Sequence, residues 1–270
     1  DSYNDHLVLQ ISHPGIERLK NELVSLLIEE VHPIAIYEKS TSFLRKKGGL
    51  PEARGLLYGT PSSPHITVLE NGLSYAVDLL EGQKTGLFLD QREARRLVQT
   101  LAPGRSVLNC FAYTGGFSIA ALAGGASQVD SVEISTKCAP LCDKNLALNH
   151  LSPEKHRFFA EDVFTFLQRE PLPYDLVILD PPAFVKRRED IKNAFRAYKE
   201  LNRMTRAKMK PGSLLLTCSR SYHVGEELFQ NILFRAAHEA DRSVKIVGSR
   251  FQALDHPVSI FHPESVYLKN

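Results

Sequence analysis

The sequence has no apolar run long enough to cross a membrane. Its longest uncharged apolar stretches, such as Leu214–Leu216 and Ala120–Ala123, fall far short of the roughly 18–20 residues that a spanning helix needs. The first residues also lack the apolar core of a secretory signal. We therefore expect a cytoplasmic protein without a membrane partner.

Cysteine is scarce and is not spaced for a metal or a disulfide framework. The four cysteines, Cys110, Cys138, Cys142 and Cys218, form no CxxC pair and no Cys/His zinc pattern. We therefore expect neither a bound metal nor structural disulfides.

Net charge is also small, but it is unevenly distributed. The formal charge of +2 on its own argues against a nucleic-acid partner. Residues 184–210, however, carry ten Lys/Arg against three acids, which leaves the other residues net negative. A solvated helix face is one interpretation of such a run. The other is an RNA-binding surface, for which the candidates are Lys186, Arg187, Arg188, Lys192 and Arg196.

Residues 1–85 predict a small α+β module. An alternating run at Leu7–Ile11 and a strand-like run at Ile34–Tyr37 flank a helical pattern from Ile16 to Leu27. Residues 41–64 are rich in Gly, Pro, Ser and basic residues and are expected to be irregular. Residues 66–70 and 73–78 then predict two strands that the turn Asn71-Gly72 joins into a hairpin.

Residues 86–270 predict a second domain in which helices and buried strands alternate, which is typical of a parallel sheet covered on both faces. Two further strands, at 258–261 and 265–268, would close the sheet antiparallel. The fold class is therefore α/β, Rossmann-like, with a seven-stranded, mostly parallel sheet. The expected helices lie at 92–101, 116–125, 136–150, 163–168, 191–209 and 226–240, and the expected strands at 106–111, 128–134, 156–160, 176–179, 213–218 and 244–251.

Four successive strand ends carry residues typical of a cofactor site. The first is followed by a turn containing Gly115, the second ends at Glu133, the third precedes Asp162, and the fourth ends in Asp180-Pro181-Pro182-Ala183-Phe184. In a doubly wound sheet, ligands bind at these ends. A turn, a strand-end charge and a helix N-cap are the alternative explanations of the individual residues. Their order matches the class I S-adenosylmethionine-dependent methyltransferases.

The resemblance extends to a narrower family. Residues 109–118 (NCFAYTGGFS), 82–92 (GQKTGLFLDQR), 180–184 (DPPAF), 255–258 (DHPV) and 267–269 (YLK) resemble the bacterial large-subunit (23S) ribosomal RNA methyltransferases that make 5-methylcytosine. That family usually carries an N-terminal PUA RNA-binding domain, to which we find no counterpart before Asp1. Its small middle module corresponds to residues 1–85, which would then help to bind RNA.

The resemblance implies a cofactor and the residues that hold it. S-adenosylmethionine would lie against the entry segment and the glycine turn, with Glu133 on the ribose hydroxyls, Asp162 on the adenine amino group and Asp180 beside the methyl group. The implied pocket residues of the entry segment and the turn are Phe88, Asp90, Gln91, Arg92, Phe111, Tyr113, Thr114 and Gly115.

One position departs from the family. Carbon 5 of cytosine is a weak nucleophile, so these enzymes attack carbon 6 with a cysteine thiolate. The gapless alignment of residues 212–221 places Arg220 where the family has that cysteine, and arginine stays protonated. Cys218, two residues earlier on the same face of the strand, could replace it only if the strand end were shifted. Packing is the alternative role for Cys218, and an ion pair with Asp180 or a phosphate is an expected role for Arg220.

Three alternatives to cytosine C5 methylation stay open. Asp180 and Phe184 could serve direct methylation of a purine nitrogen, with the flipped base stacked on the phenyl ring. The chain could bind S-adenosylmethionine and RNA without catalysis, or it could methylate a small molecule, which the basic stretch disfavours. The oligomeric state, including a homodimer, stays open as well.

Overall fold

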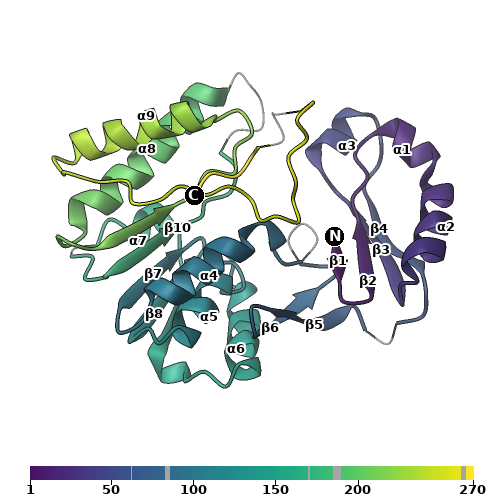
Figure 1. Cartoon of the computed structure of the whole chain (residues 1–270), viewed down its shortest axis with the longest axis horizontal. Helices are drawn as coiled ribbons and strands as arrows, with labels where there is room; N and C mark the ends of the chain where they lie inside the picture. The colour runs from purple at the N-terminus through teal and green to yellow at the C-terminus, as the bar shows by residue number, and fades with distance from the viewer. Residues whose placement is uncertain (62, 83–85, 170, 185–189, 263–265) are drawn as a thin grey trace. The chain divides into compact units, whose positions relative to one another are not determined.

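The computed structural model describes residues 1–61, 63–82, 86–169, 171–184, 190–262 and 266–270. The chain divides into two compact units, Asp1–Phe88 and Leu89–Asn270 (Figure 1). Each unit has its own sheet, and each is described by itself.

The first unit is built on a four-stranded sheet in the order β1-β2-β3-β4, together with a separate hairpin of β5 and β6. Strands β2 and β3 run parallel to each other because α1 and α2 connect them. At the two edges, β1 pairs antiparallel with β2, and β4 pairs antiparallel with β3. All of β3 is buried. The bounds are β1 Ser2–Tyr3, β2 His6–Leu9, α1 Pro14–Arg18, α2 Lys20–Val31, β3 Ala35–Ser40, α3 Phe43–Lys47, β4 Ala53–Tyr58, β5 His65–Glu70 and β6 Leu73–Asp78.

Most local predictions for this unit are confirmed, with one error. The hairpin turns at Asn71 (φ 51°) and Gly72 (φ 80°), as the Asn-Gly pair predicts. Residues 41–64 are not irregular throughout, because they contain α3 and β4. Composition concealed both elements: the Ser42 hydroxyl caps α3 by accepting a hydrogen bond from Arg45 N (3.2 Å), and β4 tolerates Gly55 at the sheet edge.

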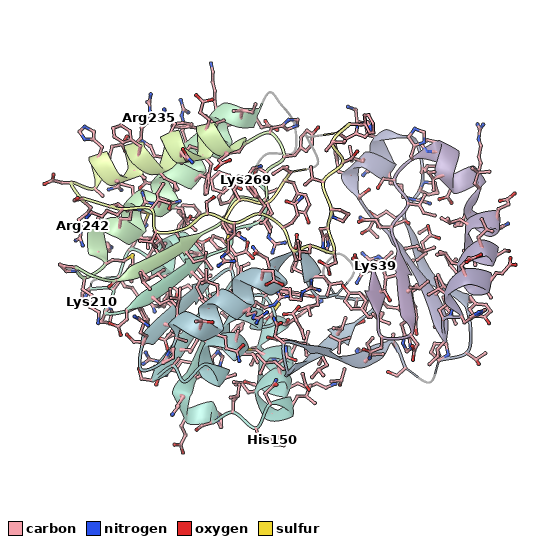
Figure 2. The ribbon with its side chains drawn as sticks, viewed as in Figure 1. Lys39, His150, Lys210, Arg235, Arg242 and Lys269 are labelled. Carbon is pink, nitrogen blue, oxygen red and sulfur yellow. The ribbon has the colours of Figure 1, made fainter. Side chains whose placement is uncertain are left out.

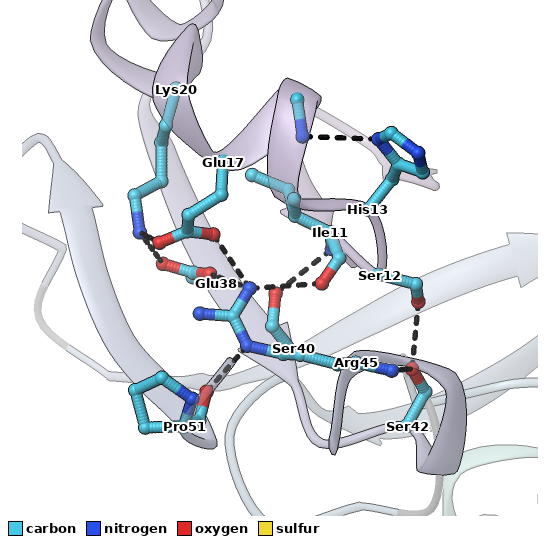
Figure 3. A network of polar contacts seen from close by, with 11 residues as sticks. Ile11, Ser12, His13, Glu17, Lys20, Glu38, Ser40, Ser42, Arg45 and Pro51 are labelled. Carbon is cyan, nitrogen blue, oxygen red and sulfur yellow. Dashed lines mark hydrogen bonds and ion pairs between the residues drawn. The ribbon is translucent and has the colours of Figure 1, made fainter. Parts of the chain in front are cut away.

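A buried ion-pair network ties α3 to the rest of this unit (Figure 3). The Arg45 guanidinium donates to Glu17 Oε2 (2.6 Å), to the Pro51 carbonyl (2.6 Å) and to the Ile11 carbonyl (3.0 Å). Lys20 bridges Glu17 (2.7 Å) and Glu38 (2.9 Å). Hydrogen bonds from Arg45, then from Lys20, lower the pKa of Glu17 to about 2. Two cations therefore balance two carboxylates, and the network fixes α3 on the sheet.

The second unit is a five-stranded sheet in the order β11-β10-β7-β8-β9, and every pair in it is parallel. Helices α8 and α9 pack against each other, as do α4 and α5 (Figure 1). The helices are α4 Arg92–Leu101, α5 Gly116–Ala123, α6 Cys138–Leu148, α7 Val163–Phe166, α8 Ile191–Lys208 and α9 Glu226–Glu239; the strands are β7 Ser106–Cys110, β8 Gln128–Glu133, β9 His156–Ala160, β10 Leu176–Leu179 and β11 Leu214–Thr217.

The alternating pattern from 92 to 240 is confirmed, but the count of seven strands is wrong for the described residues. Residues 244–251 and 258–261 form no strand, and neither does the described part of 265–268. Residues 243–250 and β11 line one cavity of about 770 Å³, together with residues of α4, α8 and α9. Among the described C-terminal residues, Ser219 and Lys269 form an isolated bridge, and Arg250 and Asn270 exchange two backbone hydrogen bonds.

Within the described ranges, no helix has both the length and the apolar content to cross a membrane.

Candidate cofactor and methyl-transfer site

The five parallel strands of the second unit end at the same edge of the sheet, and the candidate residues follow those ends. The glycine turn follows β7, Glu133 ends β8, Asp162 follows β9, Asp180 follows β10, and Cys218 and Arg220 follow β11. Parallel topology therefore brings together residues that are more than 100 positions apart in the sequence.

The turn after β7 has an unusual backbone. Phe111 (φ 60°) and Tyr113 (φ 49°) adopt left-handed conformations that cost a side chain about 1–2 kcal/mol each. Glycine is required at position 115 for two reasons: its φ of 80° is left-handed, and a Cβ there would lie 2.4 Å from Cys142 Sγ. Backbone strain of this kind is typical of a loop shaped for a ligand.

Glu133 holds this turn from the end of β8. Its carboxylate accepts hydrogen bonds from the backbone amides of Tyr113 (3.1 Å) and Ser135 (3.0 Å), and the residue is buried. A carboxylate has about four acceptor sites, so these two bonds leave capacity for hydroxyl donors such as those of a ribose.

Asp162 has a clear local role. Its Oδ1 atom accepts from the Thr165 amide (3.0 Å) and from the Thr165 hydroxyl (3.3 Å), which makes it the N-cap of α7. A cap on the short helix that follows β9 keeps the carboxylate at the sheet edge.

The strongest polar cluster surrounds Arg220. Its guanidinium donates to both carboxylate oxygens of Asp180, at 2.9 and 2.8 Å, and Nη1 lies 3.5 Å from Asp90 Oδ2. All three side chains are nearly buried, with exposures of 7 % for Arg220, 11 % for Asp180 and 7 % for Asp90. Asp180, one of the two partners considered for Arg220, is therefore the partner that this structure shows.

The C-terminal residues complete this cluster. The Tyr267 hydroxyl donates to Asp90 Oδ2 (2.8 Å), and Gln91 Nε2 donates to Asp180 Oδ1 (3.0 Å). Asn270 Nδ2 in turn donates to Gln91 Oε1 (3.1 Å). The residues from the entry segment and those after β10 and β11 thus share one hydrogen-bonded network.

Electrostatics separate Arg220 from Cys218. Burial lowers the pKa of Arg220, but the charge and hydrogen bonds of Asp180, followed by the charge of Asp90, raise it above its ordinary value. Cys218 is fully buried, and desolvation followed by the charge of Asp180 raises the pKa of its thiol well above the ordinary value. The group at the family's nucleophile position is thus a fixed cation, and the nearby thiol is kept neutral.

The other three cysteines are buried as well. Desolvation is the first cause that raises the pKa of each thiol, and that of Cys142 reaches about 12. No cysteine of this chain has the exposure or the lowered pKa of a reactive thiolate.

Four further predicted residues, Arg92, Phe184, Phe88 and Thr114, lie among the described residues. Arg92 pairs with Asp255 (2.8 Å), and the half-buried Phe184 ring lies edge-on against Tyr198, 4.7 Å between centroids. Phe88 is the last residue of the first unit. Thr114 is buried in the turn, where its carbonyl accepts from Asn145 Nδ2 (2.9 Å).

The basic stretch contributes less free charge than its count indicates. Five of its ten cations have partners within the chain: Lys199 binds Glu239, Arg203 binds Glu200 of the same stretch, Lys210 (Figure 2) binds Asp175, and Arg206 and Lys208 bind backbone carbonyls. Lys192 and Arg196 are exposed on α8. Lys186, Arg187 and Arg188 lie outside the described residues. The described residues hold no group of three or more His, Cys, Asp or Glu side chains arranged for a metal ion.

Sequence reasoning missed two sets of residues. One is the pairing of Asp90 with Arg220 and Tyr267, which joins segments 130 or more residues apart and has no local pattern. The other is a buried polar chain beneath the glycine turn, formed by Asn109, Ser118, Ser131 and His156. A signal for the second set existed, since polar residues interrupt two otherwise apolar strands at 109 and 131.

Comparison with known proteins gives a consistent result. Residues 45–255 match the family model described as S-adenosylmethionine-dependent methyltransferase. The chain is 41 % identical over its whole length to a ribosomal RNA large subunit methyltransferase I of Tolumonas auensis, of which it covers 69 %. A Streptococcus mutans structure described as a SAM-dependent methyltransferase superposes over the whole chain and 69 % of its own, with a TM-score of 0.88 and 27 % identity. A methyltransferase structure complexed with SAH gives 0.87, again at 27 % identity and with the same coverage.

Proposed function

Since this chain belongs to the S-adenosylmethionine-dependent methyltransferase family, we propose that it methylates a base of large-subunit ribosomal RNA, and that the acceptor atom is a nitrogen. The substrate class rests on the 41 % identity with a ribosomal RNA large subunit methyltransferase I. Such an enzyme would act in the cytoplasm of a bacterial cell.

The cofactor fits the residues at the edge of the sheet. Gly115 lets the turn pack closely on Cys142 of α6, which fixes its backbone, and Glu133 retains acceptor capacity for hydroxyl groups. Asp90 Oδ1 is buried without a hydrogen-bond partner among the described residues. When bound, S-adenosylmethionine supplies an electrophilic methyl group on a positively charged sulfur. The cluster of Asp90, Asp180 and Arg220 sums to −1, which suits a cation.

The observation that carries the choice of atom is Arg220. A nitrogen with a lone pair accepts a methyl group directly, whereas carbon 5 of cytosine first needs a thiolate at carbon 6. Arg220 is held at the family's thiolate position by Asp180, and Cys218 is buried as a neutral thiol. Cytosine C5 methylation through Cys218 would require that strand end to rearrange.

The remaining parts of the site would handle the base and the RNA backbone. Phe184 is half-buried beside Asp180, where an aromatic ring could stack on a flipped base. Lys192 and Arg196, together with Lys186, Arg187 and Arg188, would contact phosphates.

Transfer of labelled methyl from S-adenosylmethionine to ribosomal RNA tests the substrate class. RNA from cells that lack the gene should accept methyl in its large-subunit fraction, with an affinity that falls steeply as salt rises. Tight cofactor binding with no methyl transfer to any RNA would contradict the proposal that the protein is an RNA methyltransferase. Salt-independent affinity for RNA would instead favour a small-molecule substrate.

Gly115→Ala tests the cofactor site, with Gly104→Ala as its control. Both glycines have positive φ (80° and 70°), but the new Cβ meets Cys142 only at position 115. We expect Gly115→Ala to weaken cofactor binding by at least tenfold, and Gly104→Ala to leave it unchanged while costing about 1 kcal/mol of stability. Equal effects of the two substitutions on binding would contradict the placement.

A further inference from the structure

A chain of buried hydrogen bonds runs beneath the glycine turn and crosses three strands. Asn109 Nδ2 on β7 donates to Ser118 Oγ on α5 (2.8 Å), which lies 2.7 Å from Ser131 Oγ on β8. Ser131 Oγ in turn lies 2.8 Å from His156 Nε2 on β9. All four residues are buried. Polar groups in such a layer fix the geometry of the elements they join, because leaving any of them unpaired is costly.

His156 reaches the turn by a second route as well. Its Nε2 atom lies 3.8 Å from Cys142 Sγ, the atom that a Cβ on Gly115 would meet. One turn further along α6, Asn145 donates to the Thr114 carbonyl (2.9 Å). The first route ends at Ser118, in the first turn of the helix that begins directly after Gly115. The His156 ring thus contacts Ser131 and Cys142, and each of these residues connects it to the turn.

The donors along the first route favour a neutral ring. The Asn109 amide nitrogen can only donate, so the Ser118 hydroxyl donates its hydrogen bond to Ser131 Oγ, and the Ser131 hydroxyl donates to His156 Nε2. The ring then accepts at Nε2 and carries its proton on Nδ1, a tautomer assigned from the donors. A protonated ring would donate at Nε2 and force the Ser131 hydroxyl to turn.

The charges around the ring act in opposite directions. Burial lowers the pKa of His156, and the carboxylates of Asp143 on α6 and Asp130 on β8 raise it by less. Asp130 is already bonded by Arg157 and Tyr174, and the Cys142 thiol is neutral because burial raises its pKa. The ring is therefore neutral at pH 7 and becomes protonated only below its ordinary pKa.

We propose that His156 is a positioning residue for the cofactor turn. The neutral ring, acting through Ser131 and Ser118 and through Cys142, holds Gly115 and the first turn of α5 in the geometry that binds S-adenosylmethionine. Protonation of the ring loosens that geometry and weakens binding. This inference rests on the cofactor site proposed above.

The test is the dissociation constant of S-adenosylmethionine, measured by calorimetry between pH 8 and pH 5.5. We expect wild-type binding to weaken progressively toward pH 5.5, by less than about tenfold, because the pKa of the free ring lies below its ordinary value. His156→Gln keeps an acceptor but does not titrate, so it should bind within about threefold of wild type at pH 8 and vary less with pH. Titration of the cofactor itself is common to both proteins and cancels in the comparison.

Ser131→Ala breaks the first route while leaving the ring in place. It should weaken binding at pH 8 and reduce the pH dependence, and it decides the matter if His156→Gln does not fold. Its matched control is Ser106→Ala at the amino end of β7, where the hydroxyl bonds Asp175 (2.7 Å) away from the turn. That control should leave both the affinity and its pH dependence unchanged.

A second readout needs no turnover. The His156 ring should titrate at a lower pH in the cofactor complex than in the free protein, which NMR of labelled histidine measures, since binding favours the neutral ring. Wild-type affinity that is constant from pH 8 to 5.5, or an identical pH dependence in His156→Gln, would overturn the proposal. Tight cofactor binding without transfer to RNA would overturn the proposed function and leave this inference standing.

Discussion

Each unit buries one arginine among carboxylates, and the two clusters differ in charge balance. In the first unit, Arg45 and Lys20 face Glu17 and Glu38, so two cations meet two anions. In the second, Arg220 alone faces Asp180 and Asp90, which leaves one negative charge in excess. Arg45 also donates to two backbone carbonyls, whereas Arg220 lies at the carboxyl edge of the sheet, beyond the end of β11.

From this difference in charge we assign a structural role to the Arg45 cluster and propose a ligand-binding role for the Arg220 cluster. A cluster with balanced charges needs no further ion and holds α3 in place. An unbalanced buried cluster is stabilised by an added positive charge, which the sulfonium of S-adenosylmethionine would supply at the proposed site. The following predictions test that distinction, beginning with the largest expected effect.

Arg45→Met should destabilise the first unit by about 3–5 kcal/mol, because it leaves Glu38 buried with one cation fewer. Urea unfolding measures the loss. Lys46→Met, one residue along and exposed, is the control and should change stability by less than about 0.5 kcal/mol. Similar losses in the two variants would remove the structural role assigned to Arg45.

Glu17 should make the first unit acid-sensitive. Its pKa of about 2 lies below the ordinary 4.5, so its stabilisation is complete above pH 4.5 and is lost as the pH falls toward 2. The loss should be on the order of 2 kcal/mol, since one pKa unit corresponds to about 1.4 kcal/mol and the site is partly exposed.

Unfolding free energies from pH 6 to pH 3 should therefore fall less steeply for Glu17→Gln than for the wild type. Glu22→Gln, on the exposed side of α2, provides the control and should keep the wild-type slope. An unchanged slope in Glu17→Gln would show that the network does not depend on this carboxylate.

Asp90→Asn should discriminate between cofactor and product. Removing the excess negative charge should weaken S-adenosylmethionine binding by about tenfold and that of the uncharged-sulfur product by less than about threefold. Calorimetry with both ligands measures the ratio, and Asp241→Asn, an exposed change in the same unit, should not alter it. Equal weakening of both ligands would mean that the charge excess has no role in recognition.

Cys218→Ala should have the smallest effect. The thiol is fully buried, so its loss should cost about 1 kcal/mol of stability by thermal or urea unfolding. The rate of methyl transfer should stay within about twofold of the wild type. A rate that falls by two orders of magnitude or more would make Cys218 a catalytic residue.

Much of the secondary structure of the second unit could be predicted from hydrophobic periodicity and from the turn residues between the periodic segments. Helix 92–101 and strand 156–160 have the predicted bounds, because an amphipathic repeat and an apolar run between turn residues each favour one structure. The failures at 41–64 and 244–251 have a different origin. The cap that Ser42 provides and the non-strand conformation of residues 243–250 depend on contacts that local composition does not encode.

The site was predictable where it lies on consecutive strand ends and not where it depends on distant partners. Asp180 and Glu133 stand out because strand order predicts a shared edge. The pairing of Asp90 with Arg220, and the chain from Asn109 to His156, required the folded structure, because no spacing rule links residues on different strands.

The identity of the methylated nucleoside tests the central claim most directly. Large-subunit RNA that this protein has methylated should be digested to nucleosides and analysed by mass spectrometry against authentic standards. The arrangement of Arg220 with Asp180 and the buried Cys218 predict a base methylated on nitrogen. Recovery of 5-methylcytosine as the product would contradict it.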